Sequence, residues 1–516
     1  MILHKRIVIT GFTAICIFCS CQSKSMPENP NIIIIMADDL GYGDVGAYGA
    51  KKENVKTPNI DKLAEGGLKF TSGYCSASTC TPTRYSFLTG SYAFRESNTG
   101  IAPPNAPAII KPGTETIASL LKKAGYKTAV IGKWHLGLGG PEGPDWNGDL
   151  KPGPREIGFD FNFLLPTTND RVPQVYVQNH RVKNLDPSDP LWVGHEKPSE
   201  KHPTGITHRN TLRMNWNDGH NNTIHNGIGR IGFYTGGHMA RFRDEDLADE
   251  WQRQANKWIE ENKDNPFFLF FSSHDIHVPR MPHERFQGKS GMSYRGDAIV
   301  QLDWNVGEIM KTLDRLNLKK NTLVIFVSDN GPVLDDGYDD FANEQLGDHK
   351  PAGPYSGGKY TVREGGTRIP FITYWENIIQ PGISKEMVST IDLPASMAAL
   401  TGIDLPNDGV LDSFNVLDAL LGKRGAKGRQ YIVSQDNGRK GNYGLRDGNW
   451  KLQRHDAKRM YNGDLSMDSW TVPQYTLFNL DKDIAEANDV SKDYPQITER
   501  LKDQLQSIID RGKTRF

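Results

Sequence analysis

Asn31-Ile-Ile-Ile-Ile-Met-Ala37, followed at once by Asp38-Asp39, is the stretch that decides the fold. Its apolar residues run without alternation, which is typical of a strand buried on both faces of a parallel sheet. Three later runs have the same form and also end in polar residues. They are residues 127–131, which lead into Lys133-Trp134-His135; residues 266–271, which lead into His274-Asp-Ile-His277; and residues 322–327, which lead into Asp329-Asn330.

Patterns with the period of a helix separate these runs, at residues 116–123, 245–262 and 294–316. Strands that alternate with helices predict an α/β fold with a large, mostly parallel central sheet covered by helices on both faces. Ligands of such sheets bind beyond the carboxyl ends of the strands. Because all four runs carry ionisable residues at that end, we expect four distant segments to converge on one pocket.

The C-terminal part of the chain has a different pattern. A hairpin-like run at 443–452 contains an Asp-Gly turn, a further strand is expected at 475–480, and an amphipathic helix at 496–510. We therefore predict a main domain over residues 30–425 and a smaller subdomain of antiparallel sheet and helix over 426–516. A chain of 516 residues is long enough for both.

The N-terminus has the pattern of a targeting segment. Lys5 and Arg6 precede an apolar run at 7–18 that is short for a membrane span, and Cys21 follows. The pattern resembles a bacterial lipoprotein signal over residues 1–21, with Cys21 lipidated and a polar linker at 22–29. An ordinary cleaved signal peptide is the alternative. Either interpretation predicts export, to the periplasm or to the outer membrane as an anchored lipoprotein.

The overall charge limits the partners. The net charge is −1, so no global basic field exists to gather nucleic acid or an anionic membrane. We expect no nucleic-acid partner, and contact with a membrane only through the lipid anchor. Beyond the signal segment only Cys75 and Cys80 remain, so no disulfide framework is expected.

Two pairs of residues at the strand ends supply hard oxygen ligands. Asp38-Asp39 and Asp329-Asn330 together favour Ca²⁺ or Mg²⁺ over zinc. Asp38-Asp39 taken alone would be explained as a turn or a helix cap. The two histidines of residues 274–277 suggest zinc, but no cysteine or third clustered ligand supports that metal.

The segment Cys80-Thr-Pro82-Thr83-Arg84 carries the most specific signal. Pro82 suits the first turn of a helix, and the helix N-terminus with Arg84 offers a site for an anion. A reactive thiolate is the first interpretation of Cys80. A bare thiolate, however, is a soft nucleophile and matches a hard sulfur(VI) or phosphorus centre poorly.

This segment resembles the signature of the type I sulfatases, in which the cysteine is oxidised to formylglycine. Residues 125–137, which include Lys133 and His135, resemble the second signature of that family, which belongs to the alkaline phosphatase superfamily. The similarity extends from Asn31 to Pro370 and is closest to the arylsulfatase-like carbohydrate sulfatases of bacteria. Thr83 stands where many members have serine.

The resemblance implies a set of roles. Ca²⁺ would be held by Asp38, Asp39, Asp329, Asn330 and an oxygen of the hydrated aldehyde made from Cys80. One hydroxyl of that hydrate would attack sulfur, while Arg84 stabilises charge on the sulfate oxygens. Lys133 and Lys359 would bind the sulfate group. His277 would protonate the leaving alcohol, and His135 would take a proton from the second hydroxyl. A formylglycine-generating enzyme is the implied maturation partner.

Residues 167–243 form a long irregular segment, which is typical of a functional loop region. Its start resembles bacterial sulfatases that act on carbohydrate, which implies Thr167, Asp170 and Arg171 as substrate-binding residues, with His274 as a further pocket residue. A local ion pair that orders the loop is an equal alternative for Asp170-Arg171. We expect a sulfated sugar substrate, 6-O-sulfated galactose or N-acetylgalactosamine of glycosaminoglycans or related glycans.

Two other functions remain open on the sequence. A phosphoesterase of the same superfamily would share the sheet and the metal ligands, and a glycan-binding lipoprotein without catalysis would share the export signal. Neither requires a cysteine at position 80. The aspartates of residues 335–340 are expected to form a solvated face or a rim to the site.

Overall fold

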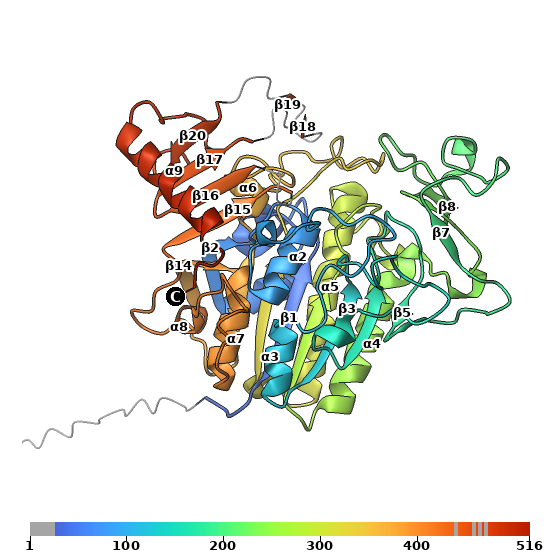
Figure 1. Cartoon of the computed structure of the whole chain (residues 1–516), viewed down its shortest axis with the longest axis horizontal. Helices are drawn as coiled ribbons and strands as arrows, with labels where there is room; N and C mark the ends of the chain where they lie inside the picture. Colours follow the sequence, from blue (N-terminus) through green and yellow to red (C-terminus); the bar gives the residue numbers. More distant parts are fainter. Residues whose placement is uncertain (1–25, 438–441, 457–460, 463–466, 469–472, 516) are drawn as a thin grey trace, which may run out of the picture.

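The computed structural model describes residues 26–437, 442–456, 461–462, 467–468 and 473–515. A ten-stranded sheet forms its centre, in the order β14-β2-β13-β12-β1-β11-β3-β4-β5-β6 (Figure 1). The four predicted strands are confirmed and lie side by side in its middle: β12 (Thr322–Ser328), β1 (Asn31–Ala37), β11 (Phe267–Ser272) and β3 (Lys127–Lys133). These four run parallel, and β4 (Phe161–Leu165) continues the parallel order.

The β1 strand is buried on both faces, as its composition predicts. Ile32, Ile34 and Met36 pack into one apolar cluster and Ile33 and Ile35 into the other, all with no exposed surface. Full burial of a side chain of this size stabilises the fold by about 1.5–3 kcal/mol. The strand therefore anchors two cores and fixes the direction in which the following aspartates leave the sheet.

Two layers of helices cover the sheet. One face carries α1 (Pro58–Gly66), α4 (Leu247–Asn262) and α5 (Ser293–Arg315). The other carries α2 (Cys80–Thr89), α3 (Ile117–Lys123), α7 (Leu393–Thr401) and α8 (Leu417–Leu420). The remaining strands at the sheet edges are β2 (Leu68–Tyr74), β13 (Phe371–Tyr374), β14 (Gly382–Ser389), β5 (Val177–Gln178) and β6 (Arg181–Val182). The predicted α/β class with helices on both faces is confirmed.

A second, antiparallel sheet is built by the C-terminal part of the chain. Its order is β15 (Tyr431–Gln435), β16 (Tyr443–Asp447), β17 (Trp450–Arg454) and β20 (Tyr475–Asn479). The predicted hairpin is the β16–β17 pair, and α9 (Pro495–Asp510) packs Leu501, Leu505 and Ile508 against the sheet. A short ribbon of β18 (Tyr461–Asn462) and β19 (Met467–Asp468) completes the described strands of this region.

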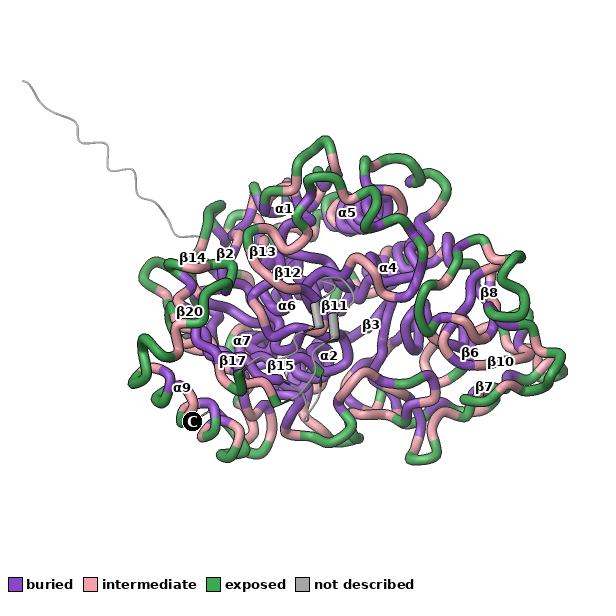
Figure 2. Tube along the Cα trace, turned by 90° about the horizontal axis from the view of Figure 1, so that it is seen from above, coloured by how far each residue is buried: buried purple, intermediate pink, exposed green. Residues whose placement is uncertain are grey.

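The irregular segment after β4 projects from the main body at the opposite side from the C-terminal sheet (Figure 1). It contains the short strands β7 (Trp192–Gly194), β8 (Ile224–His225), β9 (Ile228–Gly229) and β10 (Phe233–Thr235), joined by loops. Seen from above, much of its outer surface is exposed, whereas the centre of the molecule is buried (Figure 2). The segment therefore supplies exposed outer loops, while its inner residues such as Val172, Val175 and Tyr234 pack into the core.

The predicted signal segment, with Cys21, lies outside the described residues. Within the described part of the chain, none of the helices combines the length and apolar character needed to cross a bilayer.

Candidate active site

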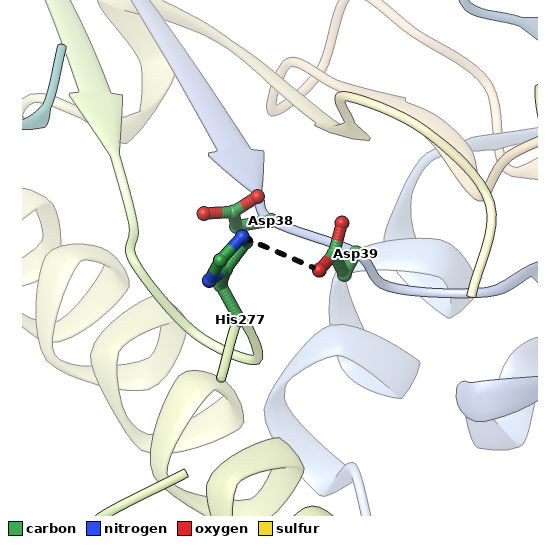
Figure 3. Close-up of side chains that lie close together, drawn as sticks. All are labelled: Asp38, Asp39 and His277. Carbon is green, nitrogen blue, oxygen red and sulfur yellow. Dashed lines mark ion pairs between the residues drawn. The ribbon is translucent and has the colours of Figure 1, made fainter. Parts of the chain in front are cut away.

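Side chains from separate strand ends meet at the carboxyl edge of the central sheet. Asp38 and Asp39 follow β1, and the side chain of His277 reaches them from the loop after β11 (Figure 3). Asp329 follows β12, and its Oδ1 accepts a hydrogen bond of 3.2 Å from the amide of Asp39. Asp39 has a left-handed backbone (φ 59°), which breaks the strand alternation that would otherwise send consecutive side chains to opposite faces. The expected convergence is thus observed.

The oxygen ligands of this cluster fit a hard divalent cation. One ligand atom each of Asp38, Asp39 and His277 lie within 4.8 Å of one another, and all three residues are buried. Oδ1 of Asp38 and Oδ1 of Asn330 are buried without a hydrogen-bond partner among the described residues. A buried polar atom without a partner lowers the stability of the fold by about 1–3 kcal/mol unless a hydrogen bond or a metal ion engages it. Unpaired carboxylate and carboxamide oxygens are the donors that calcium prefers.

The pKa of Asp38 supports the same conclusion. Burial raises it well above its ordinary value, and repulsion from Asp329 and Asp39 raises it further, against the attraction of Lys133. Crowded buried carboxylates of this kind require positive charge nearby if they are to stay ionised. The residues present therefore suit a metal ion at this position.

Three buried cations pair with these carboxylates. Lys133 Nζ contacts Asp38, and Lys359 Nζ lies 2.9 Å from Oδ2 of Asp39. Arg84 Nε donates to Oδ2 of Asp329 at 2.9 Å. The guanidinium of Arg84 also donates to the carbonyl oxygen of Lys133 at 3.2 Å and to Ser272 Oγ at 2.5 Å, which fixes it against two strand ends. All the predicted cations of the site thus lie together.

Cys80 is the first residue of α2 and is 1% exposed. Burial raises the pKa of its thiol, and the nearby Lys133 and Lys359 offset this only in part. An unmodified Cys80 would therefore stay protonated at neutral pH, and only the thiolate is a strong nucleophile. The interpretation of Cys80 as a simple reactive thiolate gains no support from the site.

His135 is oriented toward Cys80 by its backbone surroundings. Its Nε2 lies 3.1 Å from the carbonyl oxygen of Ala102, and its Nδ1 lies 3.1 Å from Sγ of Cys80. A carbonyl oxygen only accepts, so the ring proton is on Nε2 and the lone pair of Nδ1 faces residue 80. Burial and Lys133 lower the pKa of His135 well below its ordinary value, which keeps the ring neutral. A neutral imidazole with this tautomer is suited to accept a proton from residue 80.

His277 lies between the acidic cluster and the irregular segment. Its Nδ1 donates to the carbonyl oxygen of Val278 at 2.7 Å, and its Nε2 lies 3.9 Å from Oδ2 of Asp39. Burial, Lys359 and Lys133 lower the pKa of His277 well below its ordinary value. The ring is therefore neutral in the free site.

The predicted sugar-binding residues form a small network beside His277. Arg171 Nη1 donates to Oδ2 of Asp170 at 2.7 Å, and Oδ1 of Asp170 lies 4.0 Å from Nδ1 of His277. The side chain of Asp170 is 2% exposed and that of Arg171 17%. The pair is thus a local ion pair, as one interpretation of the sequence predicts, and it borders the site; contact with a sugar stays a prediction. Thr167 Oγ1 donates to the carbonyl oxygen of Arg171 at 3.0 Å.

His274 points toward another element. Its Nδ1 accepts a hydrogen bond of 3.1 Å from Trp251 Nε1 on α4, and its Nε2 lies 3.6 Å from Asp275. The structure does not bring it to Asp170 or Arg171, where the other predicted sugar contacts lie.

Two further residues contact the predicted site residues. The sequence held no signal for the first, and the second belongs to the aspartates expected as a solvated face or a rim. His220, from the irregular segment, places Nε2 3.1 Å from Oδ2 of Asp170. Asp336 places Oδ2 2.8 Å from Lys359 Nζ and accepts a hydrogen bond of 2.9 Å from the hydroxyl of Tyr360. The interpretation of the aspartates at 335–340 as a rim fits Asp336, whereas a solvated face is wrong for Asp340, which is buried against Arg280 at 2.6 Å.

The fold and the site correspond to a known family. Residues 30–403 match the family model described as Sulfatase. The chain is 46% identical over 505 residues to an N-acetylgalactosamine-6-O-sulfatase of Bacteroides thetaiotaomicron, covering 96% of this chain and 98% of that protein. It is 34% identical over 426 residues to human arylsulfatase A, covering 82% of this chain and 74% of that protein.

A solved structure is similar over almost the whole chain. It comes from work on the metabolism of multiple glycosaminoglycans by Bacteroides thetaiotaomicron, with a TM-score of 0.90 and 47% identity, and the match covers 94% of this chain and 100% of that one. Family, sequence and fold agree: the chain belongs to the sulfatase family of enzymes.

Proposed function

We propose that this sulfatase removes a 6-O-sulfate group from N-acetylgalactosamine, or from galactose, in glycosaminoglycans or related glycans, using Ca²⁺ and a formylglycine made from Cys80. The observation that carries the proposal is the position of residue 80. It lies at the start of a buried helix, 3.1 Å from the unprotonated nitrogen of His135, beside carboxylates with unpaired oxygens.

The metal would be held by Asp38, Asp39, Asp329 and Asn330, which supply only oxygen. Bound there, a calcium ion supplies positive charge for the sulfate oxygens, and the hydrated aldehyde at position 80 supplies an oxygen nucleophile of the hardness that sulfur(VI) requires. Lys133, Lys359 and Arg84 add fixed positive charge around the same point, in a site closed to bulk water.

The two histidines have opposite tasks in this proposal. His135 accepts a proton from residue 80, because its lone pair already faces that side chain. His277 donates a proton to the leaving sugar oxygen. His277 is neutral in the free site because burial, and then Lys359 and Lys133, lower its pKa. The negative charge of an incoming sulfate ester favours the protonated form of His277.

The choice of sugar rests on the relative from Bacteroides thetaiotaomicron and on the loop at Asp170. That relative is an N-acetylgalactosamine-6-O-sulfatase and aligns with 96% of this chain. Asp170, Arg171 and His220 form a buried donor and acceptor set within reach of His277. Sugar hydroxyls require such paired donors and acceptors, and a site built for them rejects substrates that leave them unpaired.

We also propose that the chain is exported and lipidated at Cys21, and that a formylglycine-generating enzyme converts Cys80. The pattern of residues 1–21 supports the first point and the segment Cys80–Arg84 the second.

A panel of substrates tests the function. The protein, produced together with a formylglycine-generating enzyme, should release sulfate from 6-O-sulfated N-acetylgalactosamine and not phosphate from the matching sugar phosphate. Treatment with a calcium chelator should abolish the release, and added Ca²⁺ should restore it. Faster release of phosphate than of sulfate would instead favour the phosphoesterase alternative.

A further inference from the structure

We propose that Glu486, in the C-terminal subdomain, is a positioning residue for the sulfate-binding Lys359. The inference rests on the proposed role of Lys359. It assigns a task in the reaction to the C-terminal subdomain, through a clasp between its buried carboxylate and the loop of residues 356–366, called here the Lys359 loop.

The Lys359 loop is short and returns on itself. The amide of Gly365 donates to the carbonyl oxygen of Ser356 at 2.8 Å, which closes its two ends. In between, Lys359 is 1% exposed and reaches Asp39 and Asp336 at 2.9 and 2.8 Å. Whatever holds the two ends of the loop therefore also sets the position of the ammonium group at the site.

Glu486 holds both ends. Its Oε2 accepts a hydrogen bond of 2.7 Å from the amide of Glu364 and lies 3.4 Å from Ser356 Oγ. Its carbonyl oxygen accepts a hydrogen bond of 3.3 Å from Arg363 Nη1. The side chain thus binds the loop at its first residue and again near its end, on either side of Lys359.

The other carboxylate oxygen ties the loop to the second sheet. Oε1 of Glu486 accepts a hydrogen bond of 2.6 Å from Gln453 Nε2 on β17. Lys451, two residues earlier and so on the same face of the strand, lies 2.9 Å from Oε1 of Glu364. The neighbouring α6 (Glu364–Thr367) lies against this sheet in Figure 1.

Two features distinguish Glu486 from an ordinary buried residue. Glu486 is 1% exposed, and a buried carboxylate is unfavourable unless it is fully hydrogen-bonded. Its backbone is also left-handed (φ 52°), a conformation that residues with a Cβ rarely adopt. Such outliers concentrate where the surrounding structure fixes a functional geometry.

Glu486→Gln tests the clasp, with Asp412→Asn as a matched control. Asp412 is also a buried carboxylate that joins the C-terminal segment to the main domain, through Arg95 at 2.6 Å and Thr514 at 2.8 Å, but it does not touch the Lys359 loop. Hydrogen exchange of the amides of residues 357–366 is measured in both variants. Glu486→Gln should raise the exchange rate about tenfold, and Asp412→Asn should leave it unchanged even where it lowers Tm.

A kinetic measurement accompanies the exchange. Glu486→Gln should raise KM for the sulfated sugar and the inhibition constant of inorganic sulfate several-fold, with a smaller change in kcat, while Asp412→Asn moves neither. Unchanged exchange in Glu486→Gln, or equal changes in both variants, overturns the clasp. A wild-type protein without sulfatase activity, but with the expected exchange pattern, refutes the proposed function and leaves the clasp standing.

Discussion

Nδ1 of His135 lies 3.1 Å from Sγ of Cys80, and a backbone carbonyl fixes the ring so that its lone pair points at that side chain. This relationship sets the first prediction. His135→Gln should lower kcat by about 10²–10⁴-fold, the usual loss when a proton acceptor is removed. His225→Gln is the control, because His225 is likewise buried but bonds to Tyr234 and Phe242 in the irregular segment. Similar losses of kcat in both variants would contradict a specific role of His135, because loss of any buried histidine would then have the same effect.

The loss of activity on removing His277 should depend on how strongly the leaving group requires a proton. We expect His277→Ala to lower kcat/KM strongly for a sulfated sugar and far less for an activated aryl sulfate, whose leaving oxygen departs as a stable anion. The measurement is kcat/KM of the His277→Ala variant on each of the two substrates, relative to the wild type. Equal losses on both would remove His277 from the role of acid.

A substitution of Asp170 distinguishes a role in sugar recognition from a role in ordering the loop alone. Asp170→Asn should lower kcat/KM for the sulfated sugar about 10- to 100-fold, equivalent to one buried charged hydrogen bond, while an aryl sulfate is nearly unaffected. Asp189→Asn serves as the control, since Asp189 forms an ion pair with His238 at 2.8 Å on the outer part of the same segment. If both substrates suffer alike, the Asp170-Arg171 pair only orders the loop.

Removal of the metal should affect stability as well as activity. Asp38 and Asn330 carry buried oxygens that no described side chain satisfies, so the folded state should bind Ca²⁺ and the unfolded state should not. Added Ca²⁺ should raise Tm, by an amount that grows with its concentration, and Asn330→Ala should weaken the rise. A Tm that is indifferent to both Ca²⁺ and chelator contradicts a metal at this position.

Glu486 makes stability depend on pH. Burial, with repulsion from Glu364, raises the pKa of Glu486 from 4.5 to about 7, against the attraction of Lys451 and Arg363. A raised pKa in the folded state stabilises the protein below about pH 4.5, and this contribution is lost as pH rises through about 7. The wild type should therefore lose more Tm than Glu486→Gln between pH 5 and pH 8. Parallel curves for the two proteins would exclude this titration.

The central sheet and most of the site could be predicted from the sequence because their signals are local. A continuous apolar run such as Asn31–Ala37 has few alternatives to a doubly buried strand, and the topology then brings the strand ends together. Asp38 and Lys133 stand directly at such an end and His277 in the loop that follows one, so their convergence follows from the fold class.

The contacts that the sequence did not reveal are made by loops without periodicity. His220 meets Asp170, and Asp336 meets Lys359, only because the loops fold back over the site. Glu486 lies 122 residues along the chain from the amide that it binds. Neither spacing nor composition encodes such contacts, since they depend on how independent loops pack in three dimensions.

The most direct measurement is the mass of the tryptic peptide from Phe70 to Arg84, isolated from the active enzyme of the native cell. We expect residue 80 to have lost its sulfur and gained a carbonyl group, while Cys75 in the same peptide is unchanged. A fully active enzyme in which residue 80 is an intact thiol would exclude the aldehyde as the nucleophile.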